Sequence, residues 1–103
     1  MYVTVQPGRV EVLEATDYRR FQVEAAASLT AADIAKQLKD SHLGEIEGDH
    51  AWIHIGALTV LLAASEGFDG RQFEAMVAYA HERGWVSDDG GSWRAHLVRA
   101  GTA

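Results

Sequence analysis

The 103-residue sequence contains no cysteine and no long uninterrupted run of apolar residues. Without cysteine, the chain can form neither a disulfide scaffold nor a thiolate metal site. No segment approaches the roughly 18 consecutive apolar residues that a membrane-spanning helix needs. The segment Met1–Val5 has neither a basic leader nor an apolar h-region. We therefore expect no signal peptide, no membrane partner and a cytoplasmic location.

Positive charge is also scarce. Nine Lys and Arg residues face fifteen Asp and Glu residues, which gives a formal net charge of −6. Between Lys39 and Arg71 there is no Lys or Arg, whereas this window holds Asp40, Glu45, Glu47, Asp49 and Glu66. Nucleic-acid binding depends on clustered cations that contact phosphates. The charge distribution therefore argues against nucleic acid as a partner.

The apolar content is sufficient for a real core. Hydrophobic residues make up 48% of the chain, and its length fits one domain. Alanine supplies much of this count, so the three Trp, three Tyr and three Phe residues must carry a large share of the packing. We expect a single domain over residues 1–103, with N-terminal strands in residues 1–27 and a body in residues 28–103.

The N-terminal segment has the two-residue period of β-strands. Residues 2–6 and 10–14 alternate, and Pro7-Gly8 between them is a turn signal, so residues 2–14 predict a hairpin. Residues 20–24 alternate again, although the same stretch could open a helix that continues into 25–27. The alternation of Phe21 and Val23 with polar neighbours favours a third strand.

The middle of the chain predicts a helix, a strand and a second helix. Thr30 has N-cap chemistry with Asp33 three residues later, so we expect a helix over 31–41 that stops at Gly44. An acidic linker, 45–49, then leads to a strand over 51–55. Residues 56–65 are apolar nearly all round, which is typical of a short buried helix.

The last third predicts a helix followed by a hairpin. Asp69 is a good N-cap, Phe68 and Phe73 are spaced for a hydrophobic staple, and Gly84 ends the helix. Residues 85–97 then turn back at 88–91. From residue 31 the element order is helix, strand, helix, helix, hairpin. This order resembles that of a winged helix, so we expect an α+β fold with a winged-helix-like body, preceded by an antiparallel hairpin or a three-stranded meander.

The segment 48–55 is the most unusual local sequence, because it holds His50 and His54 beside several carboxylates. Histidines four residues apart bind one metal ion when they lie on a helix. On a strand the same spacing spans about 13 Å, which is too far for one ion. We expect a strand, and therefore no metal and no cofactor. His50, Trp52 and His54 would then share one face of it.

The candidate binding surface combines this face with the last strand, because Trp and Arg are enriched at binding hot spots. The predicted binding residues are His50, Trp52, His54, Trp93 and Arg94. The predicted role is a non-catalytic accessory or protein-interaction module, with another protein or a second copy as partner. The plainer alternative is that these side chains only pack on a neighbouring strand.

Two other functions stay open. The first is a small enzyme or small-molecule-binding protein that uses His50, His54 and Trp52 in a pocket. If it were an enzyme, His50, His54 and Asp49 would be the acid–base groups. A pocket of roughly 300 Å³ or more with a buried histidine would favour this function. The second is a DNA-binding regulator, which the net charge disfavours.

Overall fold

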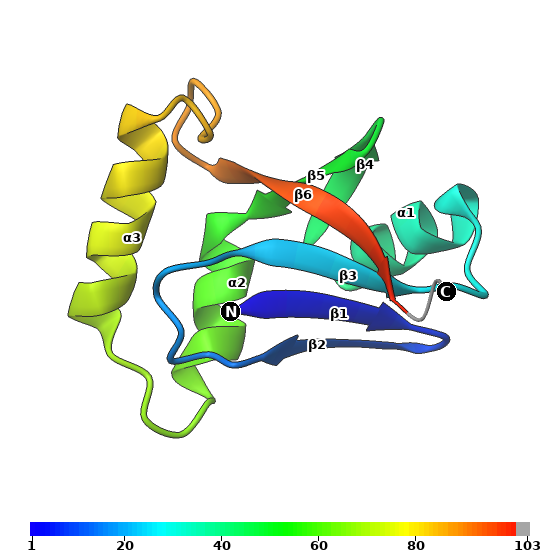
Figure 1. The fold of residues 1–103 in the computed structure, drawn as a ribbon, viewed down its shortest axis with the longest axis horizontal. Coiled ribbons are helices and arrows are strands. Elements are labelled where there is room, and N and C mark those ends of the chain that lie inside the picture. Colours follow the sequence, from blue (N-terminus) through cyan, green and yellow to red (C-terminus); the bar gives the residue numbers. More distant parts are fainter. Residues whose placement is uncertain (101–103) are drawn as a thin grey trace.

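One mixed sheet of six strands carries three helices (Figure 1). The computed structural model describes residues 1–100. The elements are β1 (Tyr2–Gln6), β2 (Arg9–Leu13), β3 (Gln22–Ala26), α1 (Ala31–Asp40), β4 (Gly44–Glu47), β5 (His50–His54), α2 (Ile55–Ala63), α3 (Gly70–Glu82) and β6 (Ser92–Ala100). The expected α+β class is confirmed. None of the helices in these residues is long and apolar enough to cross a bilayer.

The strand order is β2-β1-β3-β6-β5-β4. β1 pairs antiparallel with β2 and parallel with β3, and β3 pairs parallel with β6. β6 pairs antiparallel with β5, which pairs antiparallel with β4. The last strand therefore lies in the middle of the sheet. It joins the N-terminal strands to the β4–β5 hairpin.

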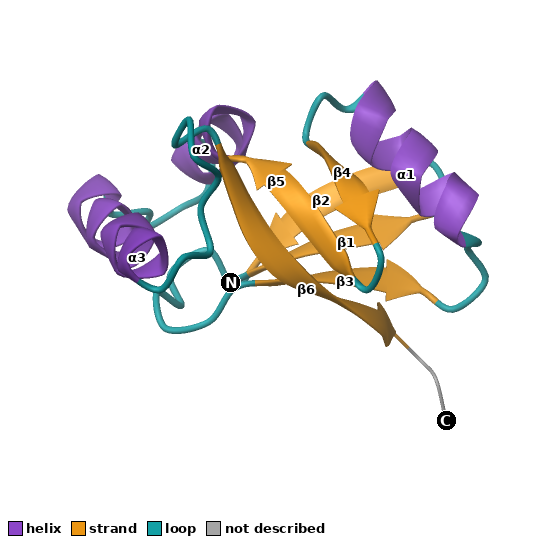
Figure 2. Ribbon diagram, turned by 90° about the horizontal axis from the view of Figure 1, so that it is seen from above, coloured by secondary structure: helices purple, strands orange, loops and turns teal. Residues whose placement is uncertain are grey.

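The helices leave one face of the sheet open. α1 packs on β1, β2 and β4, and α2 packs on β2 and β5. Figure 2 shows both on the same face, with α3 beside one end of the sheet. Alternate strand residues point to the covered face and are buried with side chains of α1 and α2: Val3, Val5, Val23, Ala51, Ile53, Ile34, Leu38, Leu58 and Leu62. The other strand residues lie on a face that carries no described helix.

Several local predictions are confirmed. The hydroxyl of Thr30 accepts a hydrogen bond from the Asp33 N–H at 3.1 Å, and the Asp33 carboxylate accepts one from the Thr30 N–H at 3.0 Å. Asp69 caps α3 by accepting from the Arg71 N–H at 2.9 Å. Gly84 takes the left-handed conformation, with φ of 77°, that ends this helix. These features depend on neighbouring residues only, which is why the sequence reveals them.

The expected linker over 45–49 is wrong, because residues 44–47 form β4 and residues 48–49 form the turn into β5. Gly44 does not stop α1 either. The helix ends at Asp40, and His42 takes the left-handed conformation with φ of 56°. Gly44 is instead buried against β5, where a Cβ atom would collide with the carbonyl oxygen of Trp52. This glycine therefore permits strand pairing.

The winged-helix arrangement is not confirmed. The expected hairpin over 85–97 forms only in part: one antiparallel bridge joins Val86 to Trp93, the Ser87 N–H donates to the Ser92 carbonyl, and the Arg94 N–H donates to the Trp85 carbonyl. The strand that should return as a wing is β6, which pairs with strands on both sides. The hairpin over 2–14 is confirmed, but the meander is wrong because β3 runs parallel to β1. The third strand covers 22–26 instead of 20–24.

The helix over 55–63 is not buried all round. Leu58 and Leu62 face the core, whereas Val60 is 71% exposed. Its apolar residues therefore cover two faces, and only one of them has a partner within the described residues.

Candidate functional site

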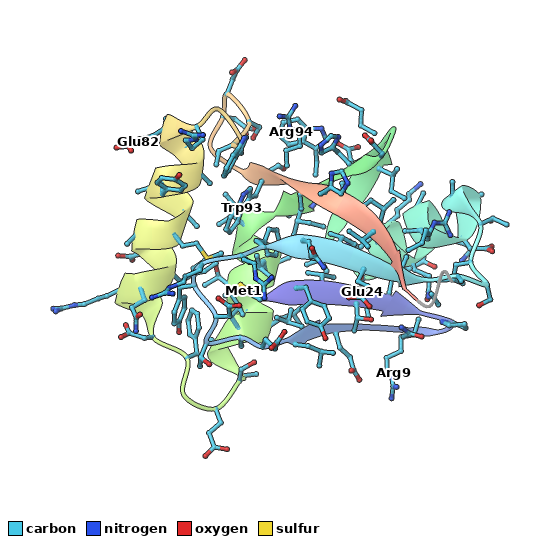
Figure 3. All side chains as sticks on the ribbon, viewed as in Figure 1. Met1, Arg9, Glu24, Glu82, Trp93 and Arg94 are labelled. Carbon is cyan, nitrogen blue, oxygen red and sulfur yellow. The ribbon has the colours of Figure 1, made fainter. Side chains whose placement is uncertain are left out.

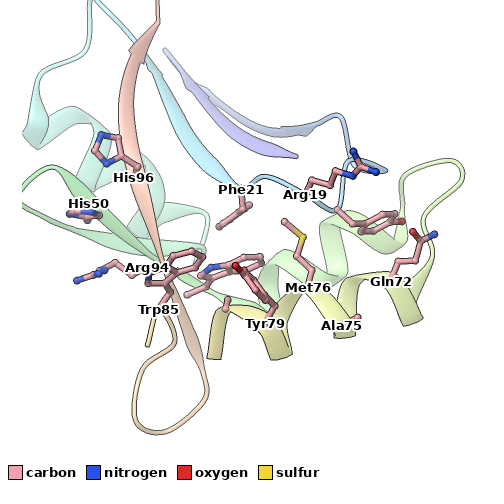
Figure 4. Close-up of a pocket in the computed structure, with 13 residues that line it drawn as sticks. Arg19, Phe21, His50, Gln72, Ala75, Met76, Tyr79, Trp85, Arg94 and His96 are labelled. Atoms are coloured by element: carbon pink, nitrogen blue, oxygen red, sulfur yellow. The ribbon is translucent and has the colours of Figure 1, made fainter. Parts of the chain in front are cut away.

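A cleft of about 820 Å³ lies between α3, the segment 18–21 that precedes β3, and the start of β6. Figure 4 shows how the chain segments surround it. Five of the nine aromatic residues of the protein line it: Tyr18, Phe21, Tyr79, Trp85 and Trp93. This concentration makes the cleft the leading candidate for a functional site.

The floor of the cleft is a packed aromatic cluster. Phe21 stacks on Trp93 with ring centroids 4.3 Å apart, and Phe73 of α3 lies 6.3 Å from the same indole. Trp93 is only 4% exposed, and Met76 and Ala80 of α3 are also buried. The floor is therefore closely packed.

The rim consists of aromatic rings that remain open to solvent. Tyr79 is 54% exposed and meets Trp85 edge to face, with ring centroids 6.1 Å apart. The guanidinium of Arg83 lies 5.8 Å and 5.6 Å from these two rings, within cation–π range. The backbone of Trp85 is fixed on both sides, since its N–H donates to Ala80 and its carbonyl accepts from Arg94. The rim is thus held in place although it is exposed.

One hydrogen bond joins two walls of the cleft. The N–H of Asp69, the N-cap of α3, donates to the Tyr18 hydroxyl at 2.7 Å. The ring of Tyr18 also lies 6.5 Å from that of Phe68. The loop before β3 and the first turn of α3 are therefore held at a fixed separation.

The charged groups of the cleft are all basic. Thirteen described residues line it, and none of them is an aspartate or glutamate. Arg19 and Gln72 lie toward one end, and Arg94 lies at the other end near His50 and His96 (Figure 4). An acidic protein thus carries a cleft whose only ionisable groups besides tyrosine are arginines and histidines.

The two histidines come from neighbouring strands. His50 of β5 and His96 of β6 are register partners, and their rings meet edge to face at 5.3 Å. The Asp49 carboxylate, which is not part of the lining, lies 2.9 Å from Nδ1 of His50. Within residues 1–100 no group of three His, Asp or Glu side chains is arranged to hold a metal ion.

The sequence-predicted residues divide between the cleft and the open sheet face. His50, Trp93 and Arg94 line the cleft, whereas Trp52 and His54 do not. Trp52 pairs with Arg94 across β5 and β6. In Figure 3, Trp93 lies on the side of β6 toward α3, and Arg94 extends away from it.

The three proposed acid–base residues are not gathered at one point. Asp49 contacts His50, but His54 stands at the start of α2, with Nδ1 3.2 Å from the His42 carbonyl oxygen. His54 lies outside the lining of the cleft. His50 is the one member of the three that faces it.

Sequence reasoning missed six of the aromatic and basic residues that line the cleft: Tyr18, Arg19, Phe21, Tyr79, Trp85 and His96. Tyr79 offered a local signal, because it lies off the apolar stripe of α3 formed by Phe73, Met76 and Ala80. A single exposed ring is common on protein surfaces, so this signal alone did not indicate a site.

No protein-family model matches the chain, and neither the curated proteins nor the solved structures include a significant match. The function is therefore inferred from the geometry of the cleft.

Proposed function

We propose that this chain is a binding domain that takes a small organic ligand, with an aromatic or other apolar part, in the cleft beside α3. The observation that carries the proposal is a cavity of about 820 Å³ whose aromatic walls are open to solvent. Ligand pockets are typically about 300–1,000 Å³ in volume, mostly apolar, with a few polar groups that orient the ligand. The cleft has this size and composition, although His50 is half-buried and not fully enclosed.

Burial of the exposed rim would supply the binding free energy. Tyr79 and Trp85 present ring surface to water, and covering an aromatic side chain fully stabilises by about 1.5–3 kcal/mol. The rim and floor are already ordered by ring contacts and backbone hydrogen bonds. A ligand would therefore bind with little loss of conformational entropy in the protein.

Fluorescence titration with Nile red, an uncharged apolar dye, tests the proposal. In the variant Trp52→Phe, the two remaining indoles, Trp85 and Trp93, both line the cleft and report on it alone. We expect saturable binding with energy transfer from these indoles. Tyr79→Ala in this background should weaken binding by about tenfold, since one rim contact is lost.

The matched control is Val60→Ala, which trims an exposed apolar residue that does not line the cleft. It should leave the dye affinity unchanged. If Tyr79→Ala binds Nile red as tightly as the unaltered cleft does, the cleft is not the binding site.

A second candidate is the protein-interaction module expected from the sequence. Its support is the open sheet face, where Trp52 and Arg94 are register partners and His50 and His54 lie on the same face of β5. Sedimentation of the wild type and of Trp52→Ala tests self-association through this face. A wild-type protein that is monomeric at high concentration would remove a second copy from this candidate.

We do not propose DNA binding. In a winged-helix-like protein α3 would be the helix that contacts bases, but its outer side carries the exposed carboxylates Glu74 and Glu82. These would repel phosphate.

A further inference from the structure

We propose that the ligand of the cleft is an organic anion, with an aromatic or other apolar body and a carboxylate or comparable acidic group held by Arg94. The inference rests on the proposed function and specifies its ligand class. Three observations carry it: the sign of the charges in the cleft, the absence of partners for its arginines, and the position of these arginines relative to the aromatic centre.

The sign of the charges is opposite to that of the whole protein. The chain has a formal net charge of −6, yet the cleft lining includes Arg19 and Arg94 and no carboxylate. His50 and His96 add ring nitrogens that donate hydrogen bonds, and each becomes positive when protonated. The guanidiniums of Arg19 and Arg94 would therefore repel a cationic group placed beside them and attract an anionic one.

The two arginines of the cleft lack an internal partner. Among the described residues outside the cleft, three basic side chains pair with carboxylates: Arg9 with Glu11 at 3.1 Å, Arg20 with Asp17 at 3.8 Å and Lys36 with Asp40 at 2.7 Å. In the same part of the chain, Lys39, Arg71 and Arg83 have no carboxylate within 4.0 Å. Within residues 1–100 neither Arg19 nor Arg94 has a carboxylate within 4.0 Å.

The contrast is sharpest between two neighbours in the sequence. Arg20 turns to Asp17, while Arg19 lines the cleft. The donors of Arg19 and Arg94 thus remain free to bind a ligand.

The positions of the charges fit a ligand with distinct apolar and acidic parts. In Figure 4 the rings of Phe21, Tyr79 and Trp85 and the side chain of Met76 occupy the middle of the cleft. Arg94 stands at the end next to Trp85, and Arg19 stands at the opposite end. An apolar body would cover the rings, and its acidic group would then reach one of the two guanidiniums.

Arg94 is the better placed anchor of the two. It belongs to β6, and its N–H donates to the Trp85 carbonyl at 2.7 Å, so its backbone is fixed against the rim. His50 and His96 lie at the same end and offer further donors. Arg19 lies in the loop before β3, at the opposite end of the cleft from these histidines. A planar guanidinium can donate two parallel hydrogen bonds to a carboxylate, which gives orientation as well as affinity.

A matched series of three ligands tests the inference: naphthoate, its uncharged amide, and the cation naphthylmethylammonium. Equilibrium dialysis gives the affinity of each for the full chain. Naphthoate should bind at least about tenfold more tightly than the amide, because a charge-assisted hydrogen bond is added. The cation should bind most weakly.

The variant Arg94→Gln should lower the naphthoate affinity by about tenfold and leave the amide affinity unchanged. Arg19→Gln should have the smaller effect. The control is Arg71→Gln, which removes an exposed arginine of α3 that does not line the cleft, and it should change neither affinity.

Equal affinity for all three ligands, with Tyr79→Ala weakening each of them, would overturn the anion inference and leave the cleft as a binding site. An unchanged naphthoate affinity in Arg94→Gln would remove the assignment to Arg94. If Tyr79→Ala affects none of the three ligands, the proposed function fails together with the inference.

Discussion

The outer face of α2 and the cleft beside α3 are both apolar surfaces open to solvent, but they differ in shape and in charge. The α2 face is convex and aliphatic, with Val60 and Leu61 exposed and no charged residue between Ile55 and Ser65. The cleft is concave and aromatic, with basic groups at both ends. Apolarity alone therefore does not identify a ligand site. Concavity and uncompensated charge single out the cleft.

A groove between α2 and α3 also differs from the cleft in the sign of its charge. It measures about 260 Å³, and its mostly apolar lining includes the carboxylate of Glu74. This carboxylate would repel the anion that the cleft attracts.

The variants below distinguish the outer face of α2 from the cleft, beginning with the largest expected effect.

The two sides of α2 should respond very differently to truncation. Leu62→Ala removes a fully buried core side chain and should lower the free energy of unfolding by about 2–5 kcal/mol. Val60→Ala should change the free energy of unfolding by less than about 0.5 kcal/mol, because this side chain is largely exposed to solvent. Urea unfolding followed by circular dichroism measures both. A large loss for Val60→Ala would indicate that a second copy covers the outer face.

The hydrogen bond between the walls of the cleft should contribute less to the free energy of unfolding than Leu62 does, but more than Val60 does. Tyr18→Phe deletes the hydroxyl that accepts from the Asp69 N–H and should cost about 0.5–1.5 kcal/mol of stability. Tyr79→Phe is the matched control, since within residues 1–100 its hydroxyl has no hydrogen-bond partner. Similar unfolding free energies for the two variants would contradict a role for Tyr18 in fixing α3.

Lowering the pH should destabilise α3 before it destabilises α2. The Asp69 carboxylate accepts a hydrogen bond from the Gln72 side chain, which has the largest effect on its pKa, and others from the backbone N–H groups of Arg71 and Gln72. These hydrogen bonds hold the pKa of Asp69 below its ordinary value. The unfolded chain therefore takes up the proton at higher pH than the folded one. This stabilisation is present above the unfolded pKa of about 3.9 and is lost as pH falls through the folded value.

α2 offers the comparison, because its N-cap, His54, makes no side-chain cap hydrogen bond. Amide hydrogen exchange between about pH 5 and about pH 3 should show α3 losing protection first. Asp69→Asn, which keeps a capping oxygen without the charge, should reduce the pH dependence of α3. Equal loss of protection in both helices at every pH would contradict this account.

The smallest effect is expected for a charge placed on the outer face of α2. Val60→Lys should change the unfolding free energy by no more than about 0.5 kcal/mol, because lysine is a good helix former at an exposed position. Naphthoate binding should also stay the same, since the new cation lies outside the cleft. Tighter naphthoate binding in this variant would place the anion site on α2.

Short-range features of the fold could be predicted from the sequence. The caps at Thr30 and Asp69 and the glycine at 84 depend on residues within one turn, and all three are found where the sequence indicates. The strand face of His50 and Trp52 also follows from alternation alone. The pairing of this strand with β6 is a finding of the structure, because the sequence left open whether the two strands pair.

The cleft could not be predicted, because long-range pairing assembles it. Phe21 meets Trp93 only because β3 runs parallel to β6, and the sequence gives no local sign of that pairing. β4 was missed because Ile46 is its one large apolar residue among acidic neighbours. An edge strand buries too little apolar surface to show a clear period.

The most direct test of the central claim is a titration of the wild-type protein with naphthoate, followed by two-dimensional amide NMR. The largest shifts should fall on Phe21, Tyr79, Trp85 and Arg94, while the amides of α2 stay in place. Shifts concentrated on α2, or spread evenly over the chain, would contradict a cleft built to bind an organic anion.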